Sequence, residues 1–314
     1  MLRLGSVGDD VRRLQERLRE LGFYSGRIDG VFGGATLSAV KNFQAKRALK
    51  VDGIVGEETW KSLFETQKMV ASEISSYPLD YRCLTLTGTF ETGKPPLECF
   101  SAISGNFDGQ GMSFGALQWN FGQGSLQRLL KDMLNDYRDV MEQIFGDYLN
   151  VIETVINENT HEAVQFAQSI QHPVKHYIYE PWKGMFRELG RTKEFQAIQL
   201  RHAEAIFNSA LKLCKKYELN TERAVALMFD IIVQCGSIKK TTHAKIMADF
   251  EVSAQESEKL IAIAQRISEQ VNPMWKEDVL SRKLCIARGS GIVHGLWYNL
   301  EEQFGIRLIK VEDE

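Results

Sequence analysis

The sequence lacks several features that would place the protein in a specialised class. It has no run of about 18 apolar residues, so no transmembrane helix is predicted and no stable membrane association is expected. Its first residues, MLRLGSVGDDVRRLQERL, contain no apolar segment of a secretory signal. The net charge of −3 gives no basis for nucleic-acid binding. We therefore expect synthesis in the cytoplasm without a signal peptide.

Cysteine is also scarce. The five cysteines are odd in number and show no metal-ligand spacing, so we expect neither a metal nor a cofactor, and mainly free thiols in a reducing compartment. Pairing of Cys83 with Cys99 stays open. The 314 residues are 44% hydrophobic and 25% charged, which predicts a globular protein of two domains. We expect a monomer.

A short repeat marks the first domain. DGVFGGAT (29–36) returns as DGIVGEET (52–59), and each copy leads from an Asp-Gly turn into a helix start. Three amphipathic segments surround these turns. Their apolar positions are Val11, Leu14 and Leu18, then Leu37, Val40 and Phe43, then Trp60 and Leu63. The pattern predicts a small bundle of three helices.

Residues 4–63 resemble the bacterial peptidoglycan-binding domain with three helices. The motifs that carry this resemblance are Leu14-Gln15, Leu21-Gly22, Asp29-Gly30, Phe43-Gln44, Asp52-Gly53 and Thr59-Trp60. The resemblance implies anchoring to the cell wall rather than catalysis. We predict a wall-binding domain over residues 1–66, a linker helix over 67–80 and a second domain over 81–314.

The second domain is mainly helical in pattern. Apolar residues from Leu126 to Tyr137 mark one helix, and the same face continues to Phe145. The segment 221–238, TERAVALMFDIIVQCGSI, is apolar nearly all round and predicts a helix buried at a domain centre. The main interruption is GNFDGQGMSFGALQWNFGQG (105–124), which holds six glycines and one acidic residue, Asp108. The fold class is therefore mainly α, with one small β-hairpin.

Two carboxylates stand out around this interruption. Glu91 lies in a short segment closed by Gly93 and two prolines, and Asp108 follows 17 residues later. Hydrolysis of a glycosidic bond needs one protonated and one ionised carboxyl group on opposite sides of a sugar. The alternative is that Asp108 only forms an Asp-Gly turn and that Glu91 is a surface charge. Spacing alone leaves both interpretations open.

The segment TFETG…FSAISGNFDGQGMSFGALQWNFGQGSL resembles the active-site region of the lysozyme superfamily, above all the family 46 chitosanases. In that family a glutamate at a helix end precedes a hairpin of the form Gly-Asp-Gly-x-Gly-x-Thr; here Phe107 replaces the first glycine and Ser113 the threonine. The resemblance implies an α-rich lysozyme-like fold and an inverting glycosidase. It makes Glu91 the general acid, Asp108 the general base and Ser113 the holder of the attacking water.

The resemblance also bears on the substrate. Chitosanases carry an aspartate in a Gly-x-Gly-Asp stretch to bind the glucosamine ammonium, whereas GQGSL (122–126) has Ser125 at that position. A serine suits an N-acetylated sugar, so we predict a muramidase that acts on the peptidoglycan glycan strand. The predicted substrate-binding residues of the hairpin region are Gln110, Gln118, Trp119 and Ser125.

Other activities remain alternatives. A chitosanase-like glycosidase or a lytic transglycosylase would share Glu91, although a transglycosylase has no need of Asp108. A Cys-dependent peptidase would draw on Cys99 and the six histidines. A zinc amidase has less support, because Pro173 separates His172 from His176. A wall hydrolase without a signal peptide would reach its substrate through a membrane pore, which predicts an endolysin-like role.

Overall fold

The computed structural model describes residues 1–64 and 72–311 and divides into two compact units. One unit contains residues 1–77 and 213–314, and the other contains residues 78–212. We call them the first and second units. The predicted domain of residues 81–314 is thus distributed over both units, with the division after Lys212.

The N-terminal part of the first unit contains the three expected helices, α1 (Asp9–Glu20), α2 (Gly34–Lys46) and α3 (Glu57–Phe64). Their apolar faces meet in one core, in which Val11, Leu14, Leu18, Val40, Phe43, Trp60 and Leu63 are buried. Leu37 packs against this core and is partly buried. The three amphipathic segments are therefore confirmed.

The Asp-Gly repeat of the sequence is also a repeat in space, and each copy is built around a buried glutamine. The Gln15 side chain donates to Asp29 and accepts from the backbone N–H of Gly30. The Gln44 side chain donates to Asp52 and accepts from the backbone N–H of Gly53. In both copies the same amide group also donates to a threonine of the following helix. Each glutamine thereby joins an Asp-Gly turn to the next helix.

The predicted linker helix falls partly on residues 65–71, which lie outside the described residues. Its remaining part is a 3-10 helix, η1 (Glu73–Ser76), followed by Pro78 and a new helix, α4 (Leu79–Thr92). Pro78 precedes α4 in an extended conformation, with φ −56° and ψ 158°. In its described part, the segment is therefore a short 3-10 helix and the start of α4 rather than one continuous helix.

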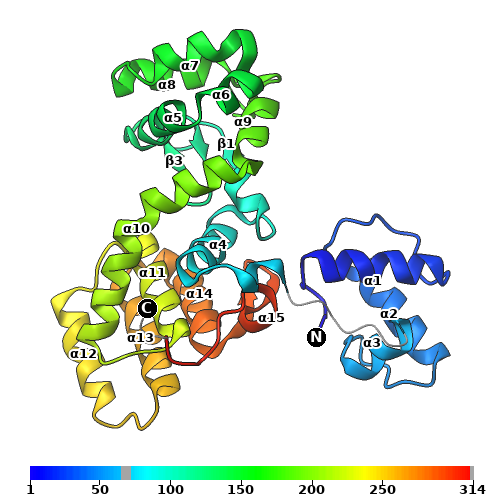
Figure 1. Ribbon diagram of the computed structural model, residues 1–314. Helices are drawn as coiled ribbons and strands as arrows, with labels where there is room; N and C mark the ends of the chain where they lie inside the picture. The colour runs from blue at the N-terminus through cyan, green and yellow to red at the C-terminus, as the bar shows by residue number, and fades with distance from the viewer. Residues whose placement is uncertain (65–71, 312–314) are drawn as a thin grey trace. The chain divides into compact units, whose positions relative to one another are not determined.

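In the second unit, helices surround a small sheet. Figure 1 shows α5, α6, α7, α8 and α9 near that sheet. The helices after α4 are η2 (Glu98–Ser101), α5 (Ser125–Asp136), α6 (Arg138–Phe145), η3 (Gly146–Tyr148), α7 (Leu149–Val155), α8 (Thr160–Ser169), α9 (Trp182–Arg191) and α10 (Lys193–Lys216). The core is aromatic: Phe114 stacks on Phe195 at 5.4 Å and meets Phe186 edge-on at 5.3 Å.

The sheet has three strands of two residues each, where we predicted a single hairpin. The strands β1 (Ile103–Ser104), β2 (Ser113–Phe114) and β3 (Trp119–Asn120) are antiparallel, in the order β1-β2-β3. Ser113 in the middle strand pairs with Ser104 on one side and with Asn120 on the other. The glycine-rich stretch therefore makes two turns, one on each side of β2.

The helical pattern of residues 126–145 is broken into two helices at Tyr137. This residue has φ −141° and ψ 52°, outside the helical region, and separates α5 from α6. The buried apolar residues continue across the break, with Met133 before it and Met141 after it. Periodicity therefore predicted the buried face correctly but did not reveal the break.

The C-terminal part of the first unit is also helical. It contains α11 (Glu222–Cys235), α12 (Lys240–Phe250), α13 (Glu256–Gln270), η4 (Pro273–Trp275), α14 (Lys276–Arg288) and α15 (Leu300–Phe304). In α11 every residue from Ala224 to Ile231 is buried, which confirms the predicted buried helix. A second hairpin, β4 (Ser290–Val293) with β5 (Leu296–Asn299), was not predicted.

Candidate functional site

Glu91 lies at the exposed end of a buried helix. All residues of α4 from Tyr81 to Phe90 are buried, whereas Glu91 is exposed. The helix ends at Thr92 and is capped by Gly93, which has φ 62° and donates its N–H to the Thr89 carbonyl at 3.0 Å. The position at a helix end agrees with the sequence prediction.

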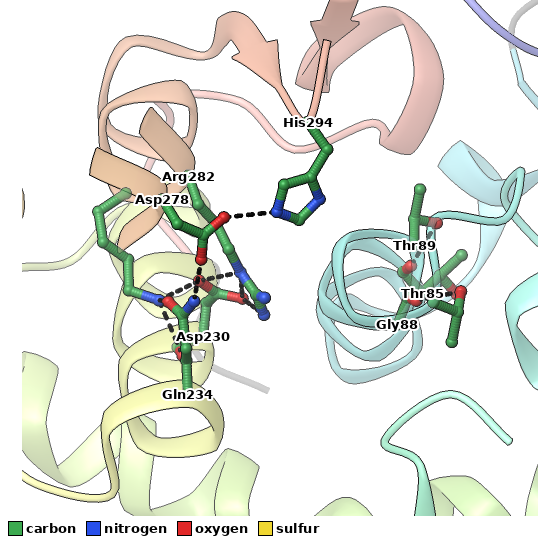
Figure 2. A network of polar contacts seen from close by, with 10 residues as sticks. Thr85, Gly88, Thr89, Asp230, Gln234, Asp278, Arg282 and His294 are labelled. Carbon is green, nitrogen blue, oxygen red and sulfur yellow. Dashed lines mark hydrogen bonds and ion pairs between the residues drawn. The ribbon is translucent and has the colours of Figure 1, made fainter. Parts of the chain in front are cut away.

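Thr85, Gly88 and Thr89 lie on α4, and Figure 2 shows the polar contacts within this helix. The Thr89 hydroxyl donates to the Thr85 carbonyl at 2.8 Å. A Cβ at Gly88 would lie 2.8 Å from the Cβ of Ala116, so only glycine permits the approach of the β2–β3 turn to this helix. Glu91 therefore follows a helical segment that packs closely against the β2–β3 turn.

Asp108 lies in the exposed loop between β1 and β2. Its Oδ1 accepts a hydrogen bond from the backbone N–H of Gln110 at 3.0 Å, across Gly109 with φ 84°. Asn106 closes the same loop by accepting from the N–H of Gly111 at 2.9 Å. The Asp-Gly turn that we considered as the alternative is therefore present, and it orients a carboxylate that remains exposed.

Ser113 follows this loop on β2 and is half-buried. Its neighbour Phe114 is fully buried in the core of the second unit, which fixes the alternation of side chains along the strand. Ser113 thus lies on a strand of the sheet, whereas Asp108 lies in the loop that precedes this strand. The catalytic functions of Glu91, Asp108 and Ser113 remain predictions.

The predicted substrate-binding residues make contacts within the hairpin region itself. Gln118 accepts from the Ser104 hydroxyl and donates to the Gly115 carbonyl, both at 2.9 Å. The Ser125 hydroxyl accepts from the N–H of Asn120 at 3.0 Å and donates to its carbonyl at 3.2 Å.

The other two predicted substrate-binding residues lie in the same region. Trp119 is half-buried against the core. Gln110 accepts from the N–H of Gly122 at 2.8 Å through its carbonyl. Substrate binding by Gln110, Gln118, Trp119 and Ser125 remains a prediction.

Sequence reasoning missed two buried glutamines that hold this region. Gln171 accepts from the N–H of Asn106 at 2.9 Å and so anchors the Asp108 loop. Gln199, on α10, accepts from the N–H of Ala116 at 2.9 Å and donates to the Phe100 carbonyl at 3.0 Å. Both lie more than 60 positions away in the chain, and no local pattern links them to the loop.

The first unit contains a buried ionic cluster (Figure 2). Asp230 accepts from Arg282 through both carboxylate oxygens and from Lys283, and all three side chains are buried. Burial raises the pKa of Asp230, but the charges of Arg282 and Lys283 outweigh it and lower that pKa to about 2. Arg282 therefore belongs to a buried structural ion pair with Asp230.

This cluster continues toward the surface. Lys283 also donates to Gln234 at 2.6 Å, and Gln234 donates to Asp278 at 3.0 Å. The other oxygen of Asp278 lies 2.5 Å from Nε2 of His294 at the tip of the β4–β5 hairpin. This connection could not be predicted from the sequence, because the residues that form it come from α11, α14 and a hairpin that the sequence did not indicate.

The buried cysteines are poor candidates for the nucleophile of a peptidase. Within residues 1–64 and 72–311 the structure has no disulfide, and Cys83 and Cys99 are separate buried thiols. Burial raises the pKa of the Cys99, Cys214 and Cys285 thiols to about 12. Because the thiolate is the reactive form, these residues are unsuited to peptidase chemistry at neutral pH.

Among the histidines, His172 is engaged within its own loop. Its Nδ1 atom accepts hydrogen bonds from the backbone N–H groups of Val174 and Lys175.

Comparison with known proteins identifies the N-terminal part of the chain. Residues 7–63 match the family described as "Putative peptidoglycan binding domain". The predicted resemblance of residues 4–63 is therefore confirmed. Within the described residues, no helix has the length and apolarity needed to cross a membrane.

The curated relatives match over short stretches. A spore cortex-lytic enzyme of Oceanobacillus iheyensis is 46% identical over 65 residues, which cover 21% of this chain and 24% of that protein. A spore cortex-lytic enzyme of Bacillus subtilis is 50% identical over 64 residues, covering 20% and 21%. The N-acetylmuramoyl-L-alanine amidase CwlM of Mycobacterium tuberculosis is 51% identical over 57 residues, covering 18% and 14%. The chain thus matches about a quarter or less of each of these three proteins.

Solved structures of chitosanases show a weaker likeness. A chitosanase complex is 16% identical, covers 70% of this chain and 95% of its own, and gives a TM-score of 0.46. The native chitosanase of Bacillus subtilis MY002 is 16% identical with a TM-score of 0.46, covering 68% and 88%. These values are too low to assign a fold or an activity.

Proposed function

We propose that the chain is a peptidoglycan hydrolase of the muramidase type that cleaves the glycan strand by acid–base catalysis. The observation that carries this proposal is the combination of a peptidoglycan-binding family match over residues 7–63 with two exposed carboxyl groups in the second unit. One of them, Glu91, ends a buried helix, and the other, Asp108, is oriented in a glycine-rich loop.

The proposed reaction divides the work between these groups. Glu91 donates its proton to the glycosidic oxygen as the bond to the anomeric carbon breaks. Asp108 removes a proton from a water molecule that attacks the anomeric carbon from the opposite face. Its Oδ1 is engaged by Gln110, so we assign Oδ2 to this water. The Ser113 hydroxyl would hold the same water, and the product would have inverted configuration.

Inversion sets a geometric requirement. A water molecule must fit between the carboxylate and the sugar, so in the substrate complex the two carboxyl groups should lie roughly 6.5–9.5 Å apart. A retaining mechanism would need a separation of about 5 Å. Proton NMR of the first anomer released from a soluble glycan distinguishes the two outcomes.

The wall-binding domain would concentrate the enzyme on an insoluble polymer. Tethering raises the local concentration of substrate without a new contact at the reacting bond. The serine at position 125, in place of the aspartate of chitosanases, favours an N-acetylated substrate over chitosan. Together these features support the peptidoglycan glycan strand as the substrate. An endolysin-like enzyme, released to the wall through a membrane pore, is the biological role that we propose.

The direct test compares the Glu91→Gln variant with the matched control Glu188→Gln, an exposed glutamate on α9 of the same unit. We expect Glu91→Gln to lower the rate of glycan cleavage by roughly 10²- to 10⁴-fold and the control to leave it unchanged. Both variants should still bind purified walls, because residues 7–63 are intact. Full activity of Glu91→Gln would refute the proposed function.

A further inference from the structure

An exposed group of aromatic side chains lies beside Asp108 in the second unit. Phe107 is 72% exposed, Tyr177 50% and Tyr179 39%. The Phe107 ring meets that of His176 at 5.1 Å, and the Tyr177 ring meets those of His172 at 5.0 Å and Tyr179 at 5.5 Å. We call these five residues, Phe107, His172, His176, Tyr177 and Tyr179, the aromatic ridge.

The ridge is held in place by the backbone beneath it. Gln171 and Ile178 form an antiparallel bridge, and the N–H of His172 donates to the Tyr177 carbonyl at 2.9 Å. A Cβ at Gly105 would collide with the His176 carbonyl, so the 171–178 loop lies directly against the start of the Asp108 loop. The two loops are thus fixed to each other within one unit.

His176 has an unfavourable backbone conformation. Its φ is +54°, a region that non-glycine residues rarely adopt, and its ring meets Phe107 in an edge-to-face arrangement of 69°. Backbone strain of this kind persists where the surroundings enforce it and often marks a functional position. Large apolar side chains grouped on a surface likewise mark contact sites.

We propose that the aromatic ridge binds a sugar ring of the glycan strand beyond the pair of sugars that is cleaved. The inference rests on the proposed function, because Asp108 follows Phe107 directly and a polymeric substrate must continue past the reacting bond. The apolar face of a pyranose stacks on an aromatic ring, while the tyrosine hydroxyls and the Nε2 atoms of the histidines supply hydrogen bonds to its hydroxyl groups. This mixture fits a sugar better than it fits a purely apolar surface.

Phe107 gives the proposal its specificity for this chain. Phe107 directly precedes Asp108 in the exposed loop between β1 and β2, so its ring belongs to the same loop as the proposed base. At 72% exposure the ring contributes little to the core of the second unit. Its removal should therefore affect substrate binding more than stability.

The first test uses steady-state kinetics of the full chain on a soluble, peptide-free octasaccharide of alternating N-acetylglucosamine and N-acetylmuramic acid. We expect Phe107→Ala and Tyr177→Ala each to raise KM roughly three- to tenfold, the effect of losing one stacking ring, with kcat unchanged. The Tyr177 ring meets those of His172 and Tyr179, and its substitution changes no residue of the loop that carries the proposed base. The control is Val174→Ala, which removes an apolar side chain 78% exposed in the same loop, and it should leave KM unchanged.

The second test measures binding without turnover. Calorimetric titration of the octasaccharide into Glu91→Gln and into Glu91→Gln/Phe107→Ala compares two inactive proteins, in which any site on residues 7–63 is common to both. A three- to tenfold weaker Kd in the double variant supports the ridge even if the wild-type chain cleaves no glycan, so this result is independent of the proposed function.

Two outcomes would overturn the inference. One is a wild-type chain that cleaves the octasaccharide while both ridge variants keep its KM and Glu91→Gln/Phe107→Ala keeps the Kd of Glu91→Gln. This result leaves the proposed function standing without the ridge. The other is a loss of affinity confined to fragments that carry stem peptides, which would make the ridge a peptide site. Equal thermal unfolding of all variants confirms that folding is not the cause.

Discussion

The backbone N–H of Gln110 donates to Oδ1 of Asp108 at 3.0 Å, so the turn that forms the loop also sets the direction of the proposed base. This relationship makes Asp108→Asn an informative change. The amide oxygen of asparagine can still accept from Gln110, whereas the amide cannot take a proton from water. We expect an intact loop and a loss of hydrolysis of roughly 10²- to 10⁴-fold.

The measurement is release of reducing sugars from purified walls, with thermal unfolding as the check on structure. A lytic transglycosylase needs no base to activate water, so it would keep most of its activity in Asp108→Asn and release anhydro-muramyl products. Retention of activity with such products would exclude the hydrolytic mechanism.

Alkylation of cysteines should leave the activity intact. The thiols of Cys99, Cys214 and Cys285 are buried, and burial raises their pKa to about 12, so they hold almost no thiolate at pH 7. Cys235 is half-buried and is the thiol we expect to react first. The test is activity after treatment with iodoacetamide, with Cys235→Ser as the control. Complete inactivation of both proteins would favour a Cys-dependent peptidase.

We expect Gln15 and Gln44 to contribute equally to the stability of the wall-binding domain. Gln15 and Gln44 are buried, and each joins an Asp-Gly turn to a helix. Replacement by leucine leaves a buried backbone N–H without its acceptor, which costs about 1–3 kcal/mol of unfolding free energy. We expect Gln15→Leu and Gln44→Leu each to lower the stability of this domain and its binding to walls.

Urea unfolding and wall sedimentation of the full chain measure these effects. The control is Asn42→Ala, an exposed position on the helix that carries Gln44. If one glutamine proves dispensable while the other does not, the two copies of the repeat are not equivalent in energy.

The repeat illustrates what the sequence reveals. The spacing of Leu14 and Leu18 on α1 and the Asp-Gly turns are local signals, so the three-helix domain could be predicted in detail. The buried helix α11 and the position of Glu91 at a helix end were also predictable, since both depend on neighbouring residues.

Features that depend on distant residues were not predictable in the same way. Gln171 holds the Asp108 loop from 65 positions away, and nothing near it indicates that contact. The break between α5 and α6 results from the φ and ψ angles of Tyr137, and the apolar pattern of the sequence continues across it. The β4–β5 hairpin has only four residues in each strand, too few for a clear alternation.

The buried Asp230 should make stability depend on pH. Its pKa is lowered to about 2 in the folded state, against about 3.9 for an ordinary aspartate. A lowered carboxyl pKa stabilises the fold at every pH above about 4, and that contribution is lost as the pH falls from about 4 to about 2. Urea unfolding of the full chain between pH 6 and pH 2 should therefore show falling stability in this window.

Asp230→Asn tests the origin of this dependence. The variant leaves Arg282 and Lys283 buried without their counter-charge, so we expect a loss of about 3–5 kcal/mol at pH 6 and a shallower pH dependence. The control is Asp249→Asn, which breaks a partly exposed pair with Arg266 and should cost no more than about 1 kcal/mol. An unchanged pH profile in Asp230→Asn would assign the acid sensitivity to other groups.

Mass spectrometry of the soluble products released from purified peptidoglycan by the full chain shows which bond the protein cleaves. We predict fragments with muramic acid at the reducing end, formed by the wild-type protein and absent with Glu91→Gln. Free stem peptides, or glycan fragments with glucosamine at the reducing end, would contradict this prediction.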